Sequence, residues 1–224
     1  MQRPSLEYQY AFDLCALEAY RAGGPIVIYV GDPFYARELL QRLEGCPTRL
    51  VPIGAWSSWA GDRQRWAGPQ LGSPSASTRD EVAGDGSPAA RTIIWAEPLP
   101  GNLAQSCGLP DALRAGGQVC VIHSGWLARL LPEWRGAQRR FPGLRSTLSW
   151  LRLQGLRVER TCGFHGPASF AWARASQVAE RLGRPDRADR WGYRGRAAYV
   201  VTGWQVLLAP VAVTLARKQP SIES

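Results

Sequence analysis

Apolar strand-like runs alternate with helix-like runs along much of this chain, and that alternation restricts its fold more than any other feature. The run at residues 25–30 stops at Gly31 and passes at once into a helix-like run at 36–43. Further strands are expected in "TRLVPI", "RTIIWAEPL", "QVCVIHSG", "LRVERTCGF" and "PVAVTLARK", and helices at 6–21, 35–44 and 168–182. Leu6, Tyr10, Leu14 and Leu17 share helical spacing in the first helix. The pattern predicts an α/β fold with a mostly parallel, helix-covered sheet.

One long stretch breaks the alternation. Between about residues 55 and 90 glycine, serine, proline and aspartate dominate, and no apolar period survives. Such a composition cannot bury enough apolar surface to offset the entropy of ordering, so we expect a flexible insertion. The length of 224 residues suits one domain of ordinary size. The sequence thus predicts a single domain over 1–224 with this insertion inside it.

The chain is strongly basic, with a formal net charge of +9, and Lys218 is its single lysine. An excess of arginine suits a nucleic-acid or anionic-membrane partner, but it also follows from a composition rich in arginine, alanine, glycine and proline. The densest stretch is 181–196, where Trp191 and Tyr193 lie among the arginines. Arginine with aromatic residues suits phosphate contact and base stacking. It equally suits a solvated helix in which Asp186 and Asp189 pair with the arginines.

The cysteines and the N-terminus bear on the compartment. Five cysteines form no CxxC pair and no zinc spacing, and the N-terminus lacks the apolar segment of a secretory signal. Both features favour reduced thiols and a cytoplasmic location. No metal site is expected, because the two histidines have no ligand pattern around them.

The uncharged stretch at 197–216 is long enough to cross a bilayer, which takes about 20 residues. Gly203 and Pro210 weaken it as a lipid-facing helix, and "PVAVTLARK" alternates as a strand does. We therefore expect the chain to end in a sheet strand, with no membrane span.

Three motifs, in order, resemble class I S-adenosylmethionine-dependent methyltransferases. "ALRAGGQVCVIHSG" resembles the glycine turn that enters the fifth strand of that family. "WLRLQGLRVERTCGF" resembles the helix, glycine and strand that supply the sixth, and "APVAVTLARK" resembles the last strand, which inserts antiparallel. The resemblance covers roughly residues 20–54 and 91–218. It implies a Rossmann-like methyltransferase fold with a seven-stranded sheet, and S-adenosylmethionine as the cofactor.

The family's first strand ends in an acidic residue and a glycine-rich turn, whereas this chain has "VGDPFY". The resemblance places Tyr29 at the acidic position and implies these cofactor contacts: Gly31, Asp32, Phe34, Tyr35 and Glu97. Two interpretations remain open. Phe34 and Tyr35 fill the space of a cofactor in a degenerate member of the family, or they stack on adenine or on the sulfonium in a divergent, active one.

The ends of the predicted strands supply the candidate catalytic residues, because open α/β sheets bind ligands at the carboxyl ends of their strands. His123, His165 and Glu97 all fall there, which suits a His–Glu acid/base group. In the alternative interpretation His123 caps a strand, and "GFHGP" is a tight turn that needs Gly163 and Gly166 for its dihedral angles.

Three hypotheses for the function follow. The first is a methyltransferase-like protein acting on a small molecule. The second is a non-catalytic binding or scaffold subunit with a protein partner. The third is an RNA-binding methyltransferase that uses the arginines of 181–196.

Overall fold

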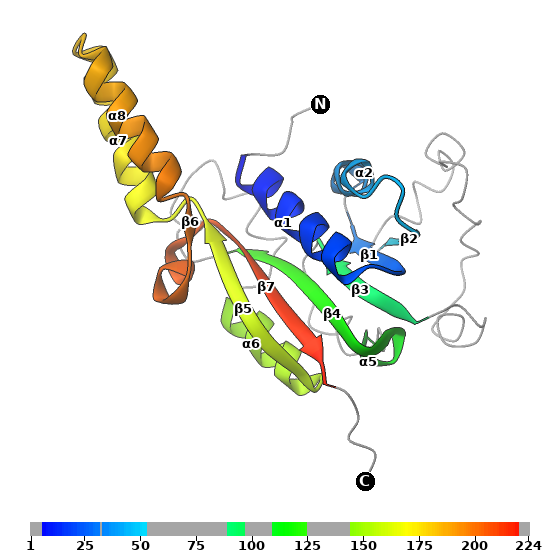
Figure 1. The fold of residues 1–224 in the computed structure, drawn as a ribbon. Coiled ribbons are helices and arrows are strands. Elements are labelled where there is room, and N and C mark those ends of the chain that lie inside the picture. Colours follow the sequence, from blue (N-terminus) through cyan, green and yellow to red (C-terminus); the bar gives the residue numbers. More distant parts are fainter. Residues whose placement is uncertain (1–5, 32, 53–88, 97–108, 125–143, 220–224) are drawn as a thin grey trace.

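The computed structural model describes residues 6–31, 33–52, 89–96, 109–124 and 144–219. Its centre is a seven-stranded sheet with the strand order β2-β1-β3-β4-β7-β5-β6 (Figure 1). The strands are β1 (Ile26–Val30), β2 (Thr48–Pro52), β3 (Ala90–Trp95), β4 (Leu113–Ser124), β5 (Leu156–Phe164), β6 (Val200–Val201) and β7 (Val211–Lys218). The insertion predicted at about 55–90 lies almost wholly outside the described residues.

The sheet is mostly parallel, as the sequence predicted. β2, β1, β3 and β4 pair in parallel, and β7 inserts antiparallel between β4 and β5. β5 therefore runs in the same direction as β4, and the two-residue β6 is antiparallel at the edge. The last strand is thus in the place and in the reversed direction that the motif "APVAVTLARK" implied.

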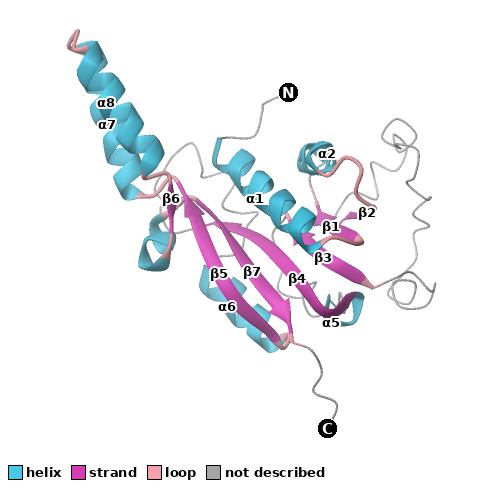
Figure 2. Ribbon diagram, viewed as in Figure 1, coloured by secondary structure: helices cyan, strands magenta, loops and turns pink. Residues whose placement is uncertain are grey.

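Helices cover both faces of the sheet (Figure 2). On one face α1 (Leu6–Ala22) and α2 (Pro33–Arg42) pack on alternate strand residues such as Ile28, Ile94 and Ile122. On the other face α6 (Leu144–Leu153) packs on the residues between them, among them Ile93 and Val121. Apolar residues point to both faces because side chains alternate along a strand and both faces are buried.

The first helix is where the sequence predicted it, but its buried face is different. Leu6, Tyr10 and Leu17 are exposed, with 53 %, 42 % and 47 % of their surfaces accessible. The residues that face the sheet also share helical spacing: Tyr8, Ala11, Phe12, Cys15, Ala16 and Ala19. Four of these six are small, which lets α1 lie close to the sheet while the larger leucines remain outside.

The chain beyond β5 forms a helical hairpin before it returns to the sheet. α7 (Pro167–Arg181) and α8 (Pro185–Ala197) lie side by side and project away from the sheet (Figure 1). The short 3-10 helix η5 (Gly203–Leu208) then leads into β7. The uncharged stretch at 197–216 is therefore broken into short elements. None of the helices in the described ranges is long and apolar enough to cross a membrane.

Candidate functional site

The predicted site lies at the rim where the parallel strands end. β1 ends beside β3, with Tyr29 opposite Trp95, and Trp95 is opposite Val121 of β4. β4 and β5 lie on either side of β7, and the last residue of each is paired with Val211 of β7. The carboxyl ends of the parallel strands thus form a single edge, as expected for a ligand site in such a sheet.

The turn after β1 is short. β1 ends at Val30 and α2 begins at Pro33, so two residues connect them. Proline suits the first turn of a helix because its fixed φ is helical and its missing N–H needs no partner there. "VGDPFY" therefore starts a helix at once, and Phe34 and Tyr35 are helical residues rather than members of an open loop.

Tyr35 packs inward against α1. Its ring stacks on the ring of Tyr8 with centroids 5.3 Å apart, and it meets the ring of Phe12 edge-on at 5.4 Å. Tyr8 and Phe12 are buried, and Tyr35 is part-buried against the same apolar cluster. Phe34 is also part-buried, and its ring centroid lies 6.4 Å from that of Tyr35. We call Tyr8, Phe12 and Tyr35 the aromatic cluster.

Arg42 connects α1 and α2, the two helices that contribute the aromatic cluster. Its Nε lies 2.6 Å from Asp13 of α1, and its Nη1 lies 2.8 Å from Glu38 of α2. The guanidinium carbon is 5.8 Å from the centroid of the Phe12 ring. The Asp13 pair and the cation–π contact therefore hold α1 against the C-terminal end of α2, while the Glu38 pair orients Arg42 within its own helix.

Tyr29, which aligns with the acidic position of the family, points to the opposite face of the sheet. It is 2 % exposed and stacks on Trp95 with centroids 5.1 Å apart. Trp95 in turn meets Trp150 of α6 edge-on at 5.1 Å. The end of β1 is thus occupied on this face by a buried aromatic stack.

His123 is completely buried within the sheet. Its Nε2 lies 2.8 Å from Oγ1 of Thr214 on β7, and that hydroxyl lies 3.1 Å from Oγ1 of Thr161 on β5. The three side chains therefore form a polar row across β4, β7 and β5. In the described part of the chain, this histidine binds its neighbours in the sheet and has no surface open to solvent.

His165 lies at the same rim but in a different environment. It follows β5 directly, with β7 between it and β4, which separates the two backbones by roughly 10 Å. Its ring contacts Tyr199, at 5.3 Å, and Phe170, and its Nδ1 lies 3.3 Å from Oγ of Ser169. Tyr199 belongs to the core on the α1 face, whereas strand alternation places His123 on the α6 face. No described contact joins the two histidines.

The turn "GFHGP" needs its glycines for a different reason from the one predicted. Gly163 and Gly166 have ordinary dihedral angles, and the positive φ of 59° belongs to His165. A Cβ on Gly166 would lie 2.6 Å from Val201, and one on Gly163 would lie 2.6 Å from Cβ of Ala209. The prediction that these glycines supply unusual dihedrals was therefore wrong. They allow β6 and the segment before β7 to approach closely.

Asp32 and Glu97 lie outside the described residues, so the predicted acid/base group and the predicted cofactor contacts stay predictions. Within the described ranges, no group of three or more histidine, cysteine, aspartate or glutamate side chains is placed to hold a metal ion. A hydrogen bond with Cys120 and burial raise the pKa of the Cys15 thiol, which disfavours the reactive thiolate.

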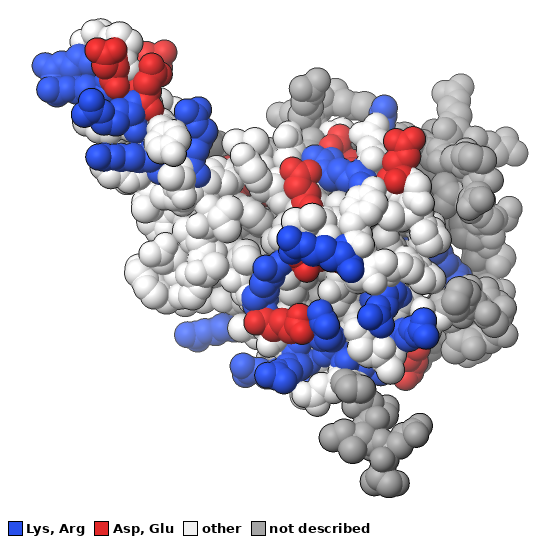
Figure 3. All heavy atoms as spheres, viewed as in Figure 1, with Lys and Arg blue, Asp and Glu red and all other residues white. Residues whose placement is uncertain are grey.

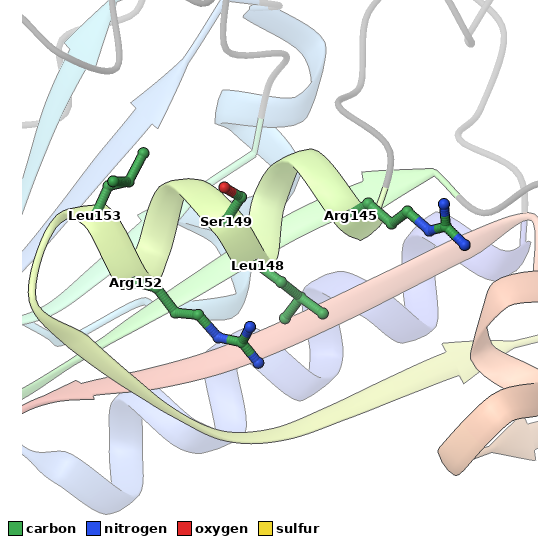
Figure 4. Close-up of a pocket in the computed structure, with 5 residues that line it drawn as sticks. All are labelled: Arg145, Leu148, Ser149, Arg152 and Leu153. Atoms are coloured by element: carbon green, nitrogen blue, oxygen red, sulfur yellow. The ribbon is translucent and has the colours of Figure 1, made fainter.

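A shallow hollow of about 370 Å³ lies along α6, away from the aromatic cluster (Figure 4). Among the described residues, those that line it come from this helix: Arg145, Leu148, Ser149, Arg152 and Leu153.

The sequence reasoning missed the partners of Tyr35. Tyr8 and Phe12 are four residues apart in a helix, so one helical face presents both rings. The spacing of Tyr8, Phe12 and the small residues around them carries the signal, but the leucines of the same helix have the stronger hydrophobic pattern.

No protein-family model matches the sequence, and no curated protein matches it. Solved structures do match. An O-methyltransferase family protein from Burkholderia thailandensis superposes with a TM-score of 0.50 at 9 % identity, over 95 % of this chain and 56 % of that one. Precorrin-6y C5,15-methyltransferase from Geobacter metallireducens GS-15 superposes with a TM-score of 0.49 at 9 % identity, over 97 % of this chain and 92 % of that one. This chain therefore spans little more than half of the Burkholderia protein.

Identities this low establish a common fold and nothing finer. The superposition on the Burkholderia protein covers nearly the whole of this chain, including its seven-stranded sheet with the antiparallel β7. The protein therefore has the Rossmann-like fold of class I S-adenosylmethionine-dependent methyltransferases, as its three motifs indicated.

Proposed function

We propose that this protein is a non-catalytic binding subunit built on the methyltransferase fold, and that it does not hold S-adenosylmethionine at its first turn. The packing of Tyr35 between Tyr8 and Phe12, directly after a two-residue turn, carries the proposal. A turn that admits the cofactor needs bare backbone beside the methionine and ribose groups. Here a helix begins at Pro33 and directs an aromatic ring into the core.

The described residues also lack the charge that the cofactor needs. A carboxylate at the end of β1 forms strong charge-assisted hydrogen bonds with the ligand, each contributing about 1.5–3 kcal/mol. Tyr29 takes that position and stacks on Trp95 on the other face of the sheet. The described residues of the first turn therefore do not fit S-adenosylmethionine in the manner of the family.

The second candidate function is a divergent methyltransferase acting on a small molecule, with S-adenosylmethionine as its cofactor. The fold shared with methyltransferases favours it. In that case Phe34, which is part-buried and follows the turn, would stack on the ligand while Tyr35 remained in the core.

Isothermal titration of the purified protein with S-adenosylmethionine and with S-adenosylhomocysteine separates the two. We expect no saturable heat up to about 1 mM ligand, which corresponds to binding weaker than about −4 kcal/mol. A known methyltransferase serves as the positive control for the ligands.

The Phe34→Ala variant sharpens the result. The proposal would be refuted if the wild type binds the ligand in the micromolar range and Phe34→Ala abolishes this binding without changing the unfolding of the protein. That result would establish the divergent methyltransferase. Tyr193→Ala is the matched control, because it removes an exposed ring from the hairpin, far along the chain from the turn.

A further inference from the structure

The hairpin of α7 and α8 is held together by small residues. Gly195 lies against the backbone of Ser169 and Ala173, with a Cβ position 3.5 Å from each. Ser176 donates a hydrogen bond of 2.7 Å from its hydroxyl to the carbonyl of Ala188 on the other helix. Because small residues fill the contact between the helices, the large side chains of the hairpin point outward.

Arginine is the commonest residue among the exposed positions of the hairpin, which also include Val178, Leu182 and Tyr193. Residues 167–197 contain seven arginines and three carboxylates, which gives this segment a net charge of +4. Figure 3 shows the basic side chains spread along the hairpin and acidic ones near its outer end. In the described part of the chain, no carboxylate lies within ion-pair distance of any of the seven. The expected pairing with Asp186 and Asp189 is therefore not found.

Three of the four arginines of α8 lie on one helical face, and Asp186, four residues before Arg190, lies at the edge of that face. Arg187, Arg190 and Arg194 are all exposed, and together with Trp191 they fall at positions i, i+3, i+7 and i+4 of one helical face. Asp189 shares a different face with Tyr193. We call Arg187, Arg190, Trp191 and Arg194 the basic face of α8.

A contact with α7 extends this face. The guanidinium of Arg194 lies 5.1 Å from the centroid of the Trp172 ring, and Trp172 is part-buried beside Gly195. This cation–π contact holds the guanidinium beside the ring while Arg194 remains exposed, so its N–H groups are available for bidentate contact with a phosphate. Two part-buried indole rings therefore lie among three exposed arginines.

From this arrangement we propose that the basic face of α8 binds single-stranded nucleic acid. The arginines would contact phosphates along about 10 Å of helix, from Arg187 to Arg194. The exposed parts of the indole rings would stack on bases, which a single strand presents and a duplex hides. An anionic membrane fits less well, because interfacial helices need a continuous apolar face opposite the charges, and here that face is the contact between the helices. The proposal goes beyond the function proposed above and does not depend on whether the first turn binds a cofactor.

The test is fluorescence anisotropy with a short, labelled, mixed-sequence RNA, the same sequence as single-stranded DNA, and its duplex. The variant Arg187→Gln/Arg190→Gln/Arg194→Gln removes three charges from the basic face. The control Arg145→Gln/Arg152→Gln/Arg157→Gln removes three exposed arginines from α6 and β5. Circular dichroism and thermal unfolding verify that both variants keep the fold.

We expect the wild type to bind single strands in the micromolar range at about 0.1 M salt, and more tightly than the duplex. Three lost phosphate contacts lower the slope of log K against log salt by about 2, which makes the α8 variant about 100-fold weaker at about 0.1 M salt. The control variant should stay within about threefold of the wild type. If the single-stranded RNA and the single-stranded DNA bind with similar affinity, phosphate contacts and base stacking account for the binding. A preference for the RNA indicates an added contact to the 2′-hydroxyl.

Two results would overturn the proposal. One is an α8 variant that binds the single strands as the wild type does, or a control variant that loses as much affinity. The other is a wild type that binds none of the three oligonucleotides but sediments with vesicles rich in phosphatidylserine, which would assign the hairpin to a membrane surface.

Discussion

The contact between α1 and α2 and the hairpin of α7 and α8 each contain an arginine beside an aromatic ring, but the charge of the arginine is satisfied differently in the two regions. At the far end of the helix that follows the first turn, Arg42 is paired with two carboxylates and lies over the buried ring of Phe12. On the hairpin, Arg194 lies over the part-buried ring of Trp172 and has no carboxylate partner among the described residues. The first arrangement satisfies its charge within the protein, and the second leaves its charge to the solvent or to a partner.

The difference teaches where a function on this fold can be sought. Arg42 pairs with carboxylates inside the protein and so stabilises the fold, which leaves little of its charge to attract a ligand. The seven arginines of residues 167–197 have no carboxylate partner among the described residues, so they raise the local positive potential and attract polyanions. We therefore assign stability to the aromatic cluster and binding to the hairpin, and the four predictions below test that division.

The largest expected effect is in the aromatic cluster. Phe12 is completely buried and contacts Tyr8, Tyr35 and the guanidinium of Arg42. Phe12→Ala should lower the free energy of unfolding by about 3–5 kcal/mol, the usual cost of removing a buried phenyl ring. Urea denaturation followed by circular dichroism measures it. Leu182→Ala, at a hairpin residue that is 65 % exposed, should change the same quantity by less than about 0.5 kcal/mol. Equal losses would remove the distinction between the two regions.

The second effect lies at the junction of the sheet and the hairpin. Gly166→Ala places a Cβ 2.6 Å from Cγ1 of Val201, which is itself buried. Overpacking of this kind costs about 1–3 kcal/mol. Thermal unfolding should therefore show a clear loss of stability. If Gly166→Ala leaves the thermal stability unchanged, β6 can shift away from residue 166 at little cost. The hairpin is then less firmly joined to the sheet than the close approach indicates.

Much of the fold was predictable because its signals are local. The strands at 25–30 and 118–124 are continuous apolar runs, which is the pattern of a strand buried on both faces. The order of three weak motifs indicated the antiparallel position of β7, and the pairing of β7 with β4 and β5 confirms it.

What the sequence did not reveal depends on packing between distant segments. The leucines of the first helix have the stronger hydrophobic signal, but the small residues beside Tyr8 and Phe12 decide which face can approach the sheet. The ring of Tyr35 finds its partners 23 and 27 residues earlier in the chain, and no local pattern joins them. The sequence therefore placed Tyr35 and the two histidines near the ends of the strands, but it did not reveal the residues that pack against them.

The third effect concerns Tyr199, which links the hairpin to the body. Its ring lies 4.8 Å from that of Tyr10 on α1. Burial, and then the carboxylate of Glu7, raise the pKa of Tyr199 above its ordinary value of 10. Below pH 10 both the folded and the unfolded chain keep this proton. Above it the unfolded chain loses the proton first, so stability falls with pH by at most about 1.4 kcal/mol per unit.

Tyr199→Phe should remove the part of the stability loss above pH 10 that comes from the proton of Tyr199, and it should leave the stability at neutral pH nearly unchanged. Urea denaturation at pH 8 and near pH 11 measures the difference. Tyr193→Phe, at an exposed tyrosine of the hairpin, serves as the control and should lose stability between the two pH values as the wild type does. If the two variants respond alike, the burial of Tyr199 does not couple the hairpin to the body.

The smallest effect is confined to the hairpin. Gly192 lies inside α8, and a Cβ there would be 3.4 Å from Oγ of Ser176, an ordinary contact distance. Alanine is favoured over glycine within a helix by about 0.5–1 kcal/mol, so Gly192→Ala should stabilise α8 where Gly166→Ala destabilises the junction. Because the two helices mainly contact each other, the gain should appear as slower amide exchange in residues 167–197 and leave β4 unaffected. Slower exchange throughout the sheet would instead show that the hairpin and the body unfold as a single unit, and the division between them would then fail.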